Sequence, residues 1–114
     1  MALRTYRATL ALIGAVTVGW TGSLDPTTVF ASDHEKVVIK DFRYVPMSLT
    51  VKAGTTVTWI NMDDEPHVVA SDTGLFRSGA LDTNETYSFK FDKPGTYQIH
   101  CSIHPRMVGT IVVE

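Results

Sequence analysis

The chain has 114 residues, of which 44% are hydrophobic, and it carries a formal net charge of −2 at neutral pH. This length predicts a single domain, and the absence of a basic stripe argues against a nucleic-acid partner. The one cysteine cannot form an internal disulfide, which is the usual reinforcement of a small secreted domain. A bound metal is the other common reinforcement.

The first 31 residues have the pattern of a secretory signal peptide. Arg4 and Arg7 give a basic start, and an apolar run follows from Ala8 to Trp20. This run is shorter than the roughly 20 residues of a membrane span. Because the small residues Val29 and Ala31 suit signal peptidase, we predict cleavage after Ala31. The alternative is an uncleaved N-terminal anchor or a buried helix.

Cleavage would leave a domain of residues 32–114. It would remove two of the ten basic and one of the twelve acidic residues, for a net charge of −3. Short segments rich in β-branched and aromatic residues recur about every ten to twelve positions, which predicts an all-β sandwich or barrel. The expected strands cover residues 36–42, 48–52, 55–61, 67–71, 85–91, 96–101 and 109–114.

In the expected strand over residues 96–101, the neighbouring residues His100 and Cys101 point to opposite faces. With a period of two, Tyr97, Ile99 and Cys101 share an apolar face, which we expect to be the core face. His100 then points outward, and we interpret it as a surface histidine. His34, in the loose start of the mature chain, receives the same interpretation.

Three residues that follow this strand end suit a soft metal. Cys101, His104 and Met107 have the spacing C-x2-H-x2-M in a tight loop. A fourth donor is His67, which follows Pro66 at the start of another expected strand. Two imidazoles, one thiolate and one weak thioether form the donor set of a blue-copper site.

Each of these residues also has an ordinary explanation. A lone buried cysteine is usually a small hydrophobe, a histidine beside proline is usually a loop residue, and Met107 could fill the core. A zinc site is conceivable, but structural zinc sites usually hold cysteine and histidine alone. A catalytic thiol would need an exposed cysteine beside a histidine base, whereas Cys101 is expected to face the core.

Residues 36–114 resemble the cupredoxins, or type 1 blue copper proteins, especially amicyanins and the shorter plastocyanin-like proteins. The resemblance is carried by "EPH" at Glu65–His67, "YQIHCSIHPRM" at Tyr97–Met107 and "GTIVVE" at Gly109–Glu114. It implies a Greek-key β-sandwich of about eight strands with copper at one end. It also implies four copper ligands: His67, Cys101, His104 and Met107.

Two features depart from that resemblance. Amicyanins and plastocyanins usually have asparagine after the first ligand histidine, where it ties two copper-bearing loops together, and here Val68 takes its place. In amicyanins the position before the second histidine is proline, and an aromatic follows the next proline. These positions are Ile103 and Arg106 here. Methylamine dehydrogenase, the amicyanin partner, is therefore not assumed.

These observations predict a monomeric one-electron carrier in the periplasm rather than an enzyme. Its partners would be a redox donor and acceptor that dock transiently near His104, with no stable membrane association after cleavage. The alternative is a copper chaperone or copper buffer outside the cytoplasm. Such proteins favour exchangeable, methionine-rich sites, and the four methionines form no cluster along the chain.

An acidic run, Asp63 to Glu65, precedes His67 and should lie at the copper end. It either steers a basic partner toward that end or is an ordinary solvated loop.

Overall fold

The computed structural model describes residues 33–114. The predicted signal peptide, residues 1–31, lies outside the described residues, so the division into residues 1–31 and 32–114 stays a prediction. Within the described part there is no helix that is long and apolar enough to cross a membrane.

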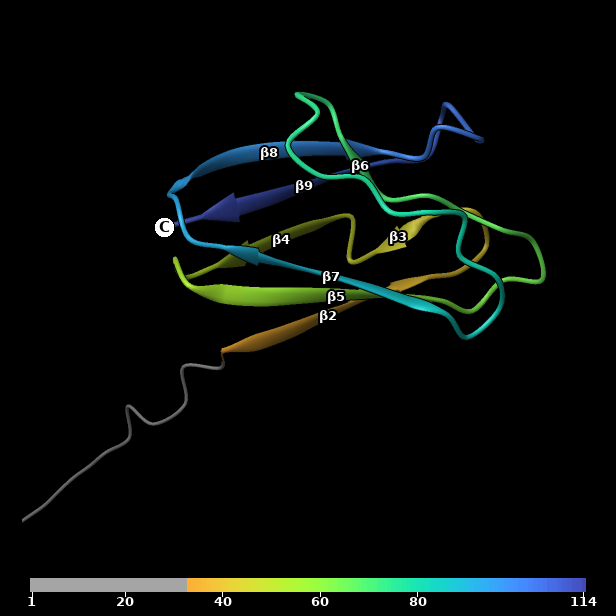
Figure 1. Cartoon of the computed structure of the whole chain (residues 1–114), viewed down its shortest axis with the longest axis horizontal. Coiled ribbons are helices and arrows are strands. Elements are labelled where there is room, and N and C mark those ends of the chain that lie inside the picture. Colours follow the sequence, from red (N-terminus) through yellow and green to blue (C-terminus); the bar gives the residue numbers. More distant parts are fainter. Residues whose placement is uncertain (1–32) are drawn as a thin grey trace, which may run out of the picture. The chain divides into compact units, whose positions relative to one another are not determined.

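Residues 33–114 form an all-β sandwich of two four-stranded sheets (Figure 1). One sheet has the order β3-β2-β5-β7 and the other the order β4-β9-β8-β6, with parallel pairing of β2 with β5 and of β4 with β9. The strands are β2 (His34–Ile39), β3 (Tyr44–Val45), β4 (Ser48–Val51), β5 (Thr55–Asn61), β6 (Ala70–Ser71), β7 (Thr86–Phe91), β8 (Gly95–His100) and β9 (Val108–Val113). The predicted fold class is confirmed.

Strand β5 shows how the alternating sequence builds the core. Every second residue of Thr55–Asn61 is buried, and Trp59 at its centre packs against the rings of Phe76 and Phe91. Burial of each such large side chain contributes roughly 1.5–3 kcal/mol. The inward face of β5 ends in a polar residue, the fully buried Asn61. In β8 the predicted alternation is confirmed, because Ile99 and the following Cys101 are buried.

Two expected strands are wrong in extent. The segment 67–71 is reduced to Ala70–Ser71, because the N–H groups of Val68 and Val69 donate to side chains instead of a neighbouring strand. The segment 36–42 ends at Ile39, because residues 41 and 42 have positive φ.

Two further expectations need correction. His34 is the first residue of β2 rather than part of a loose terminus, and it pairs in register with Thr56 of β5. The short strand β3, Tyr44–Val45, was not expected from the sequence. It is too short to show an alternation, but its pairing with β2 places Tyr44 in the core.

Candidate metal centre

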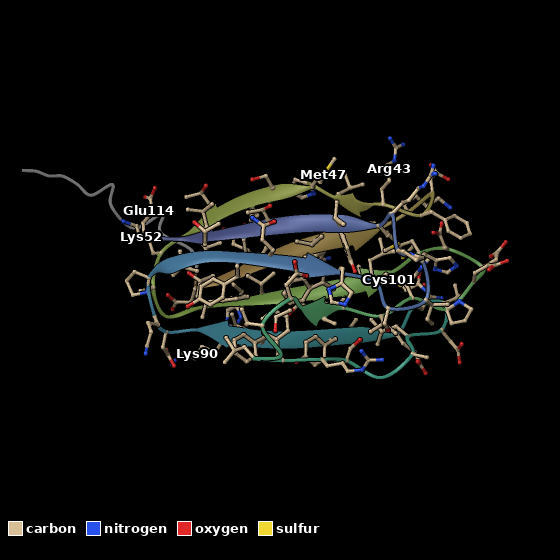
Figure 2. All side chains as sticks on the ribbon, turned by 90° about the horizontal axis from the view of Figure 1, so that it is seen from above. Arg43, Met47, Lys52, Lys90, Cys101 and Glu114 are labelled. Atoms are coloured by element: carbon tan, nitrogen blue, oxygen red, sulfur yellow. The ribbon has the colours of Figure 1, made fainter. Side chains whose placement is uncertain are left out.

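Three of the four predicted ligands meet at one end of the sandwich. Sγ of Cys101 and one ring nitrogen each of His67 and His104 all lie within 4.8 Å of one another. Nδ1 of His67 is 3.2 Å from Nδ1 of His104, and that atom is 3.7 Å from Sγ of Cys101. His67 and Cys101 are fully buried, whereas His104 is half-buried. Figure 2 shows Cys101 toward the end of the sandwich opposite Lys52 and Glu114.

The loop after β8 is closed by its own main chain. The N–H of Cys101 donates to the carbonyl of Met107 (3.0 Å), and the N–H of Met107 donates to the carbonyl of His104 (2.9 Å). These bonds hold three of the predicted ligands in one turn. Met107 is buried in this turn, and its role as the fourth ligand stays a prediction.

The two other histidines are not brought to this cluster. His100 points away from the core, as expected, and its Nδ1 lies 2.6 Å from a carboxylate oxygen of Asp72. His34 stands at the start of β2, outside the group of three convergent donors.

Asp63 is hydrogen-bonded to the first histidine, and sequence reasoning missed this contact. Its Oδ2 accepts a hydrogen bond from Nε2 of His67 at 2.8 Å, which leaves Nδ1 of that ring toward the other donors. Partners of this kind fix the tautomer and orientation of metal-binding histidines. Burial raises the pKa of the Asp63 carboxyl, but the N–H groups of Phe42 and Asp41 and the imidazole outweigh burial and hold this pKa below its usual value.

This contact corrects the interpretation of the acidic run as three surface charges. Asp63 does lie at the predicted end, but it is buried and directed at His67, so only Asp64 and Glu65 are exposed. The sequence offers one signal: Asp63 stands two residues after a strand end, where aspartate commonly bonds to nearby main-chain groups.

Asn61 shapes the loop that carries Asp63 and His67. Its Nδ2 donates to the carbonyls of Glu65 (2.8 Å) and Leu81 (2.7 Å), and its Oδ1 accepts the N–H of Asp63 (2.9 Å). The alternation of β5 places this asparagine on the core face, which was a readable sign of a buried polar role. A buried amide is stable only when it is hydrogen-bonded, and the loop main chain supplies the partners.

The sulfur of Cys101 is held by the main chain of Val68. The N–H of Val68 donates to Sγ at 3.2 Å, and the carbonyl of Val68 accepts the hydroxyl of Tyr44 at 2.7 Å. Burial, followed by the charge of Cys101, raises the pKa of Tyr44 well above its usual value, so this hydroxyl remains a donor. The loop after Cys101 is also tied outward, because the Arg77 guanidinium donates to Oγ of Ser102 at 2.9 Å. These contacts hold the site although residue 68 lacks an amide side chain.

An apolar hollow of about 390 Å³ lies beside the half-buried histidine. It is lined by Phe42, His104, Pro105, Arg106 and Met107. The Phe42 ring lies edge-to-face against both histidines, at centroid distances of 5.1 Å from His67 and 4.9 Å from His104.

Comparison with known proteins agrees with this geometry. The family model of the cupredoxin-like domain matches residues 10–113. The chain belongs to the cupredoxin-like family. It is 33% identical over 114 residues to amicyanin-alpha of Methylorubrum extorquens, covering 96% of each chain. It is 40% identical over 103 residues to a plastocyanin of Scenedesmus fuscus, covering 79% of this chain and all of the plastocyanin.

Solved structures of other copper proteins contain a similar fold. A purple cupredoxin from Nitrosopumilus maritimus matches with a TM-score of 0.66 and 33% identity, over 70% of this chain and 99% of the other. A copper-containing nitrite reductase from Thermus scotoductus matches with a TM-score of 0.65 and 30% identity, but over only 22% of the reductase. The resemblance to amicyanins and plastocyanins is therefore confirmed.

The donor set fits copper. Soft thiolate suits Cu(I) and imidazole suits copper in both oxidation states, and the structure brings together one buried thiol, one buried imidazole and one half-buried imidazole. Family membership and these convergent donors confirm copper as the predicted cofactor.

Proposed function

We propose that this chain is a small exported type 1 copper protein that carries single electrons between redox partners in the periplasm. The proposed ligands are His67, Cys101, His104 and Met107. The observation that carries the proposal is the convergence of one sulfur and two imidazole nitrogens within 4.8 Å of one another. When bound, copper supplies a centre that alternates between Cu(I) and Cu(II).

The residues around the site restrain the positions of the donor side chains. Asp63 fixes the ring of His67, and the N–H of Val68 stabilises the sulfur of Cys101. The closed turn from Cys101 to Met107 restrains the remaining donors. Because these contacts restrain the donors, little rearrangement is needed when the charge of the centre changes, and this favours rapid electron transfer.

The geometry favours a carrier over an enzyme. The three donors face one another, and two of them are fully buried. A substrate would have to displace a ligand to reach the metal, whereas catalytic metal sites keep a position open. Electrons can leave through the edge of His104, which is the donor that reaches the surface.

A visible spectrum of the reconstituted protein tests this function. An intense thiolate-to-copper charge-transfer band that bleaches and returns on one-electron reduction and oxidation would support the carrier. A colourless protein whose copper passes readily to a weak chelator would support the alternative, a copper chaperone or buffer. A protein that binds zinc but not copper would contradict both.

The proposed docking surface surrounds His104. Phe42, Ile103 and Val108 are each about half exposed (45%, 47% and 50%), and such an apolar rim suits a transient partner.

Since Asp63 is buried, any steering of a basic partner falls to Asp64 and Glu65. The double variant Asp64→Asn, Glu65→Gln would then slow electron transfer to a basic redox protein at low salt, with an unchanged spectrum. An unchanged salt dependence would exclude such steering.

Export is tested separately from redox function. We propose that residues 1–31 direct export and are removed. The mature protein recovered from the periplasm should therefore begin at Ser32. A start at Met1 in a membrane fraction would instead support an uncleaved anchor.

A further inference from the structure

Asp63 joins two parts of the site that are distant in sequence. Its Oδ2 accepts Nε2–H of His67 (2.8 Å) and the N–H of Phe42 (2.9 Å), and its Oδ1 accepts the N–H of Asp41 (2.7 Å). The residue is only 6% exposed. Three donors therefore converge on a buried group with two oxygens. A carboxylate can accept all three, whereas asparagine has a single accepting oxygen and two N–H donors.

The turn that Asp63 holds is strained. Asp41 and Phe42 have φ values of 54° and 58°, in the left-handed region that favours glycine and is an outlier for a bulky residue. Two main-chain bonds between Lys40 and Arg43 close the turn (3.0 and 3.2 Å). The bonds from both turn N–H groups to Asp63 are therefore part of what keeps this backbone in place.

The strained turn places an aromatic ring over the histidine pair. Phe42 meets His67 at an interplanar angle of 87° and His104 at 89°. It also lines the hollow beside His104, and 45% of the residue remains exposed. One side of the ring thus faces the histidines while the other faces solvent.

We propose that Asp63 is a positioning residue with two linked effects. It fixes Nδ1 of His67 as the nitrogen that faces the metal. It also holds the 41–42 turn so that Phe42 covers the two histidines and limits the access of water and small ligands to the centre. The inference rests on the proposed copper function. Its two parts are separable, because Phe42 binds Asp63 through its main chain and covers the histidines through its side chain.

The first measurement uses the full chain without copper. At a fixed, mildly alkaline pH, nitrogen-15 NMR reports which imidazole nitrogen carries the proton. Wild type and Phe42→Gly should show His67 protonated at Nε2 alone. Asp63→Asn should show a mixture of tautomers or the Nδ1–H form. Asp64→Asn, which removes an exposed neighbouring charge, is the matched control and should resemble wild type.

The second measurement is the rate at which a chelator removes copper from the loaded protein. Asp63→Asn should weaken copper binding about 10–100-fold, as loss of a partner of a metal ligand typically does, and should speed removal. Phe42→Gly should speed removal several-fold while leaving the tautomer of His67 unchanged. Leu75→Ala, which truncates an exposed apolar side chain in a different surface hollow, should not change the rate.

The stability of Phe42→Gly shows whether Phe42 covers the histidines or only contributes to packing. Because glycine accepts φ near 58° without strain, the relieved backbone offsets the lost ring contacts, and Phe42→Gly should unfold at about the same denaturant concentration as wild type. If Phe42 served packing alone, this variant would lose stability and keep the wild-type removal rate.

Distinct outcomes overturn distinct claims. An unchanged removal rate in Phe42→Gly overturns the cover. The positioning role is overturned if His67 keeps the wild-type tautomer in Asp63→Asn. It is also overturned if His67 of the wild-type protein carries its proton on Nδ1, and this second result does not depend on whether the variant folds. A wild-type chain that takes up no copper contradicts the proposed function instead, and the tautomer measurement still decides the role of Asp63.

Discussion

The two ends of the sandwich solve the same problem, the reversal of the chain between strands, by different means. At the end opposite the metal centre, Gly54 and Gly95 adopt positive φ, and the turn at 52–55 is held by main-chain bonds, including Gly54 N–H to the carbonyl of Phe91. At the metal end, the positive φ values belong to Asp41, Phe42 and Asn84.

Buried side chains explain how the metal end tolerates such residues. Asp63 accepts the N–H groups of the 41–42 turn, and Asn61 bonds to three main-chain groups of the loops beside it. The turns at the far end therefore depend on glycine and local geometry. The turns at the metal end depend instead on two polar side chains, Asp63 and Asn61, which also hold His67 and its loop. Substitutions of Asp63 and Asn61 should therefore be costly for both stability and copper binding, whereas substitutions at the far end should affect stability alone.

The largest effect is expected for Cys101→Ser. A serine hydroxyl does not supply the thiolate that gives the charge-transfer band, so the visible band should be lost completely. Met107→Leu is the matched control on the same turn. It should keep the band and change the reduction potential, because the thioether that we propose as the fourth ligand would bind only weakly. Retention of the band in Cys101→Ser would show that the ligand assignment is wrong.

Removal of copper should lower the melting temperature but leave the chain folded. The core of paired strands does not include the metal, and copper binds the native state preferentially. At free copper about 1,000-fold above the dissociation constant, binding stabilises that state by about 4 kcal/mol. Calorimetry with and without copper measures the shift. A metal-free chain with the NMR spectrum of a disordered protein would show that 82 described residues do not hold the sandwich alone.

Asn61→Ala tests whether the metal end depends on side chains. The substitution leaves three loop main-chain groups without their partner, and each buried group left unsatisfied costs about 1–3 kcal/mol, so a loss of at least about 3 kcal/mol is expected in urea unfolding. Thr58→Ala, on the same strand, breaks an exposed bond to Ser88 and should change stability by less than about 0.5 kcal/mol. Equal losses of stability in the two variants would contradict the proposed dependence of the metal end on buried polar side chains.

The sequence predicted the regular parts of this molecule better than the irregular ones. Alternation identified the core strands and the inward direction of Cys101, because a period of two depends on local backbone geometry alone. The proximity of Cys101 and His104 was also predictable, because the two residues are three positions apart and their contact depends on local loop geometry.

The contacts around these ligands were not predictable in the same way. Asp63 and His67 are four residues apart, but the turn that Asp63 holds lies 21 and 22 residues earlier. The hydroxyl of Tyr44 reaches Val68 across 24 residues. Such pairings depend on how the two sheets bring loops together, and neither a propensity nor a spacing encodes them. Asn61 was the exception that alternation could have revealed.

Tyr44→Phe should cost about 1–3 kcal/mol at neutral pH, because the carbonyl of Val68 loses its buried donor. The cost should depend on pH. In the native state the pKa of Tyr44 is raised, while an unfolded tyrosine titrates near pH 10. The stability that Tyr44 contributes is therefore complete below about pH 10 and falls as the pH rises further, because only the unfolded state releases the proton. The difference between wild type and Tyr44→Phe in urea unfolding should narrow above that pH, and a constant difference would contradict the raised pKa.

The smallest effect is expected at the far end, for Gly54→Ala. An added Cβ would meet nothing within 4 Å, so the cost comes from the backbone alone, and φ of 96° makes it about 1–2 kcal/mol. Gly79→Ala is the matched control, since its Cβ would also meet open space but its φ lies outside the left-handed region. That substitution should be neutral or stabilise by about 0.4–1 kcal/mol through the unfolded chain. Both variants should keep the wild-type copper band and potential. A shifted potential in Gly54→Ala would mean that strain at one end reaches the ligands at the other, and the two ends would then have to be treated as one coupled unit.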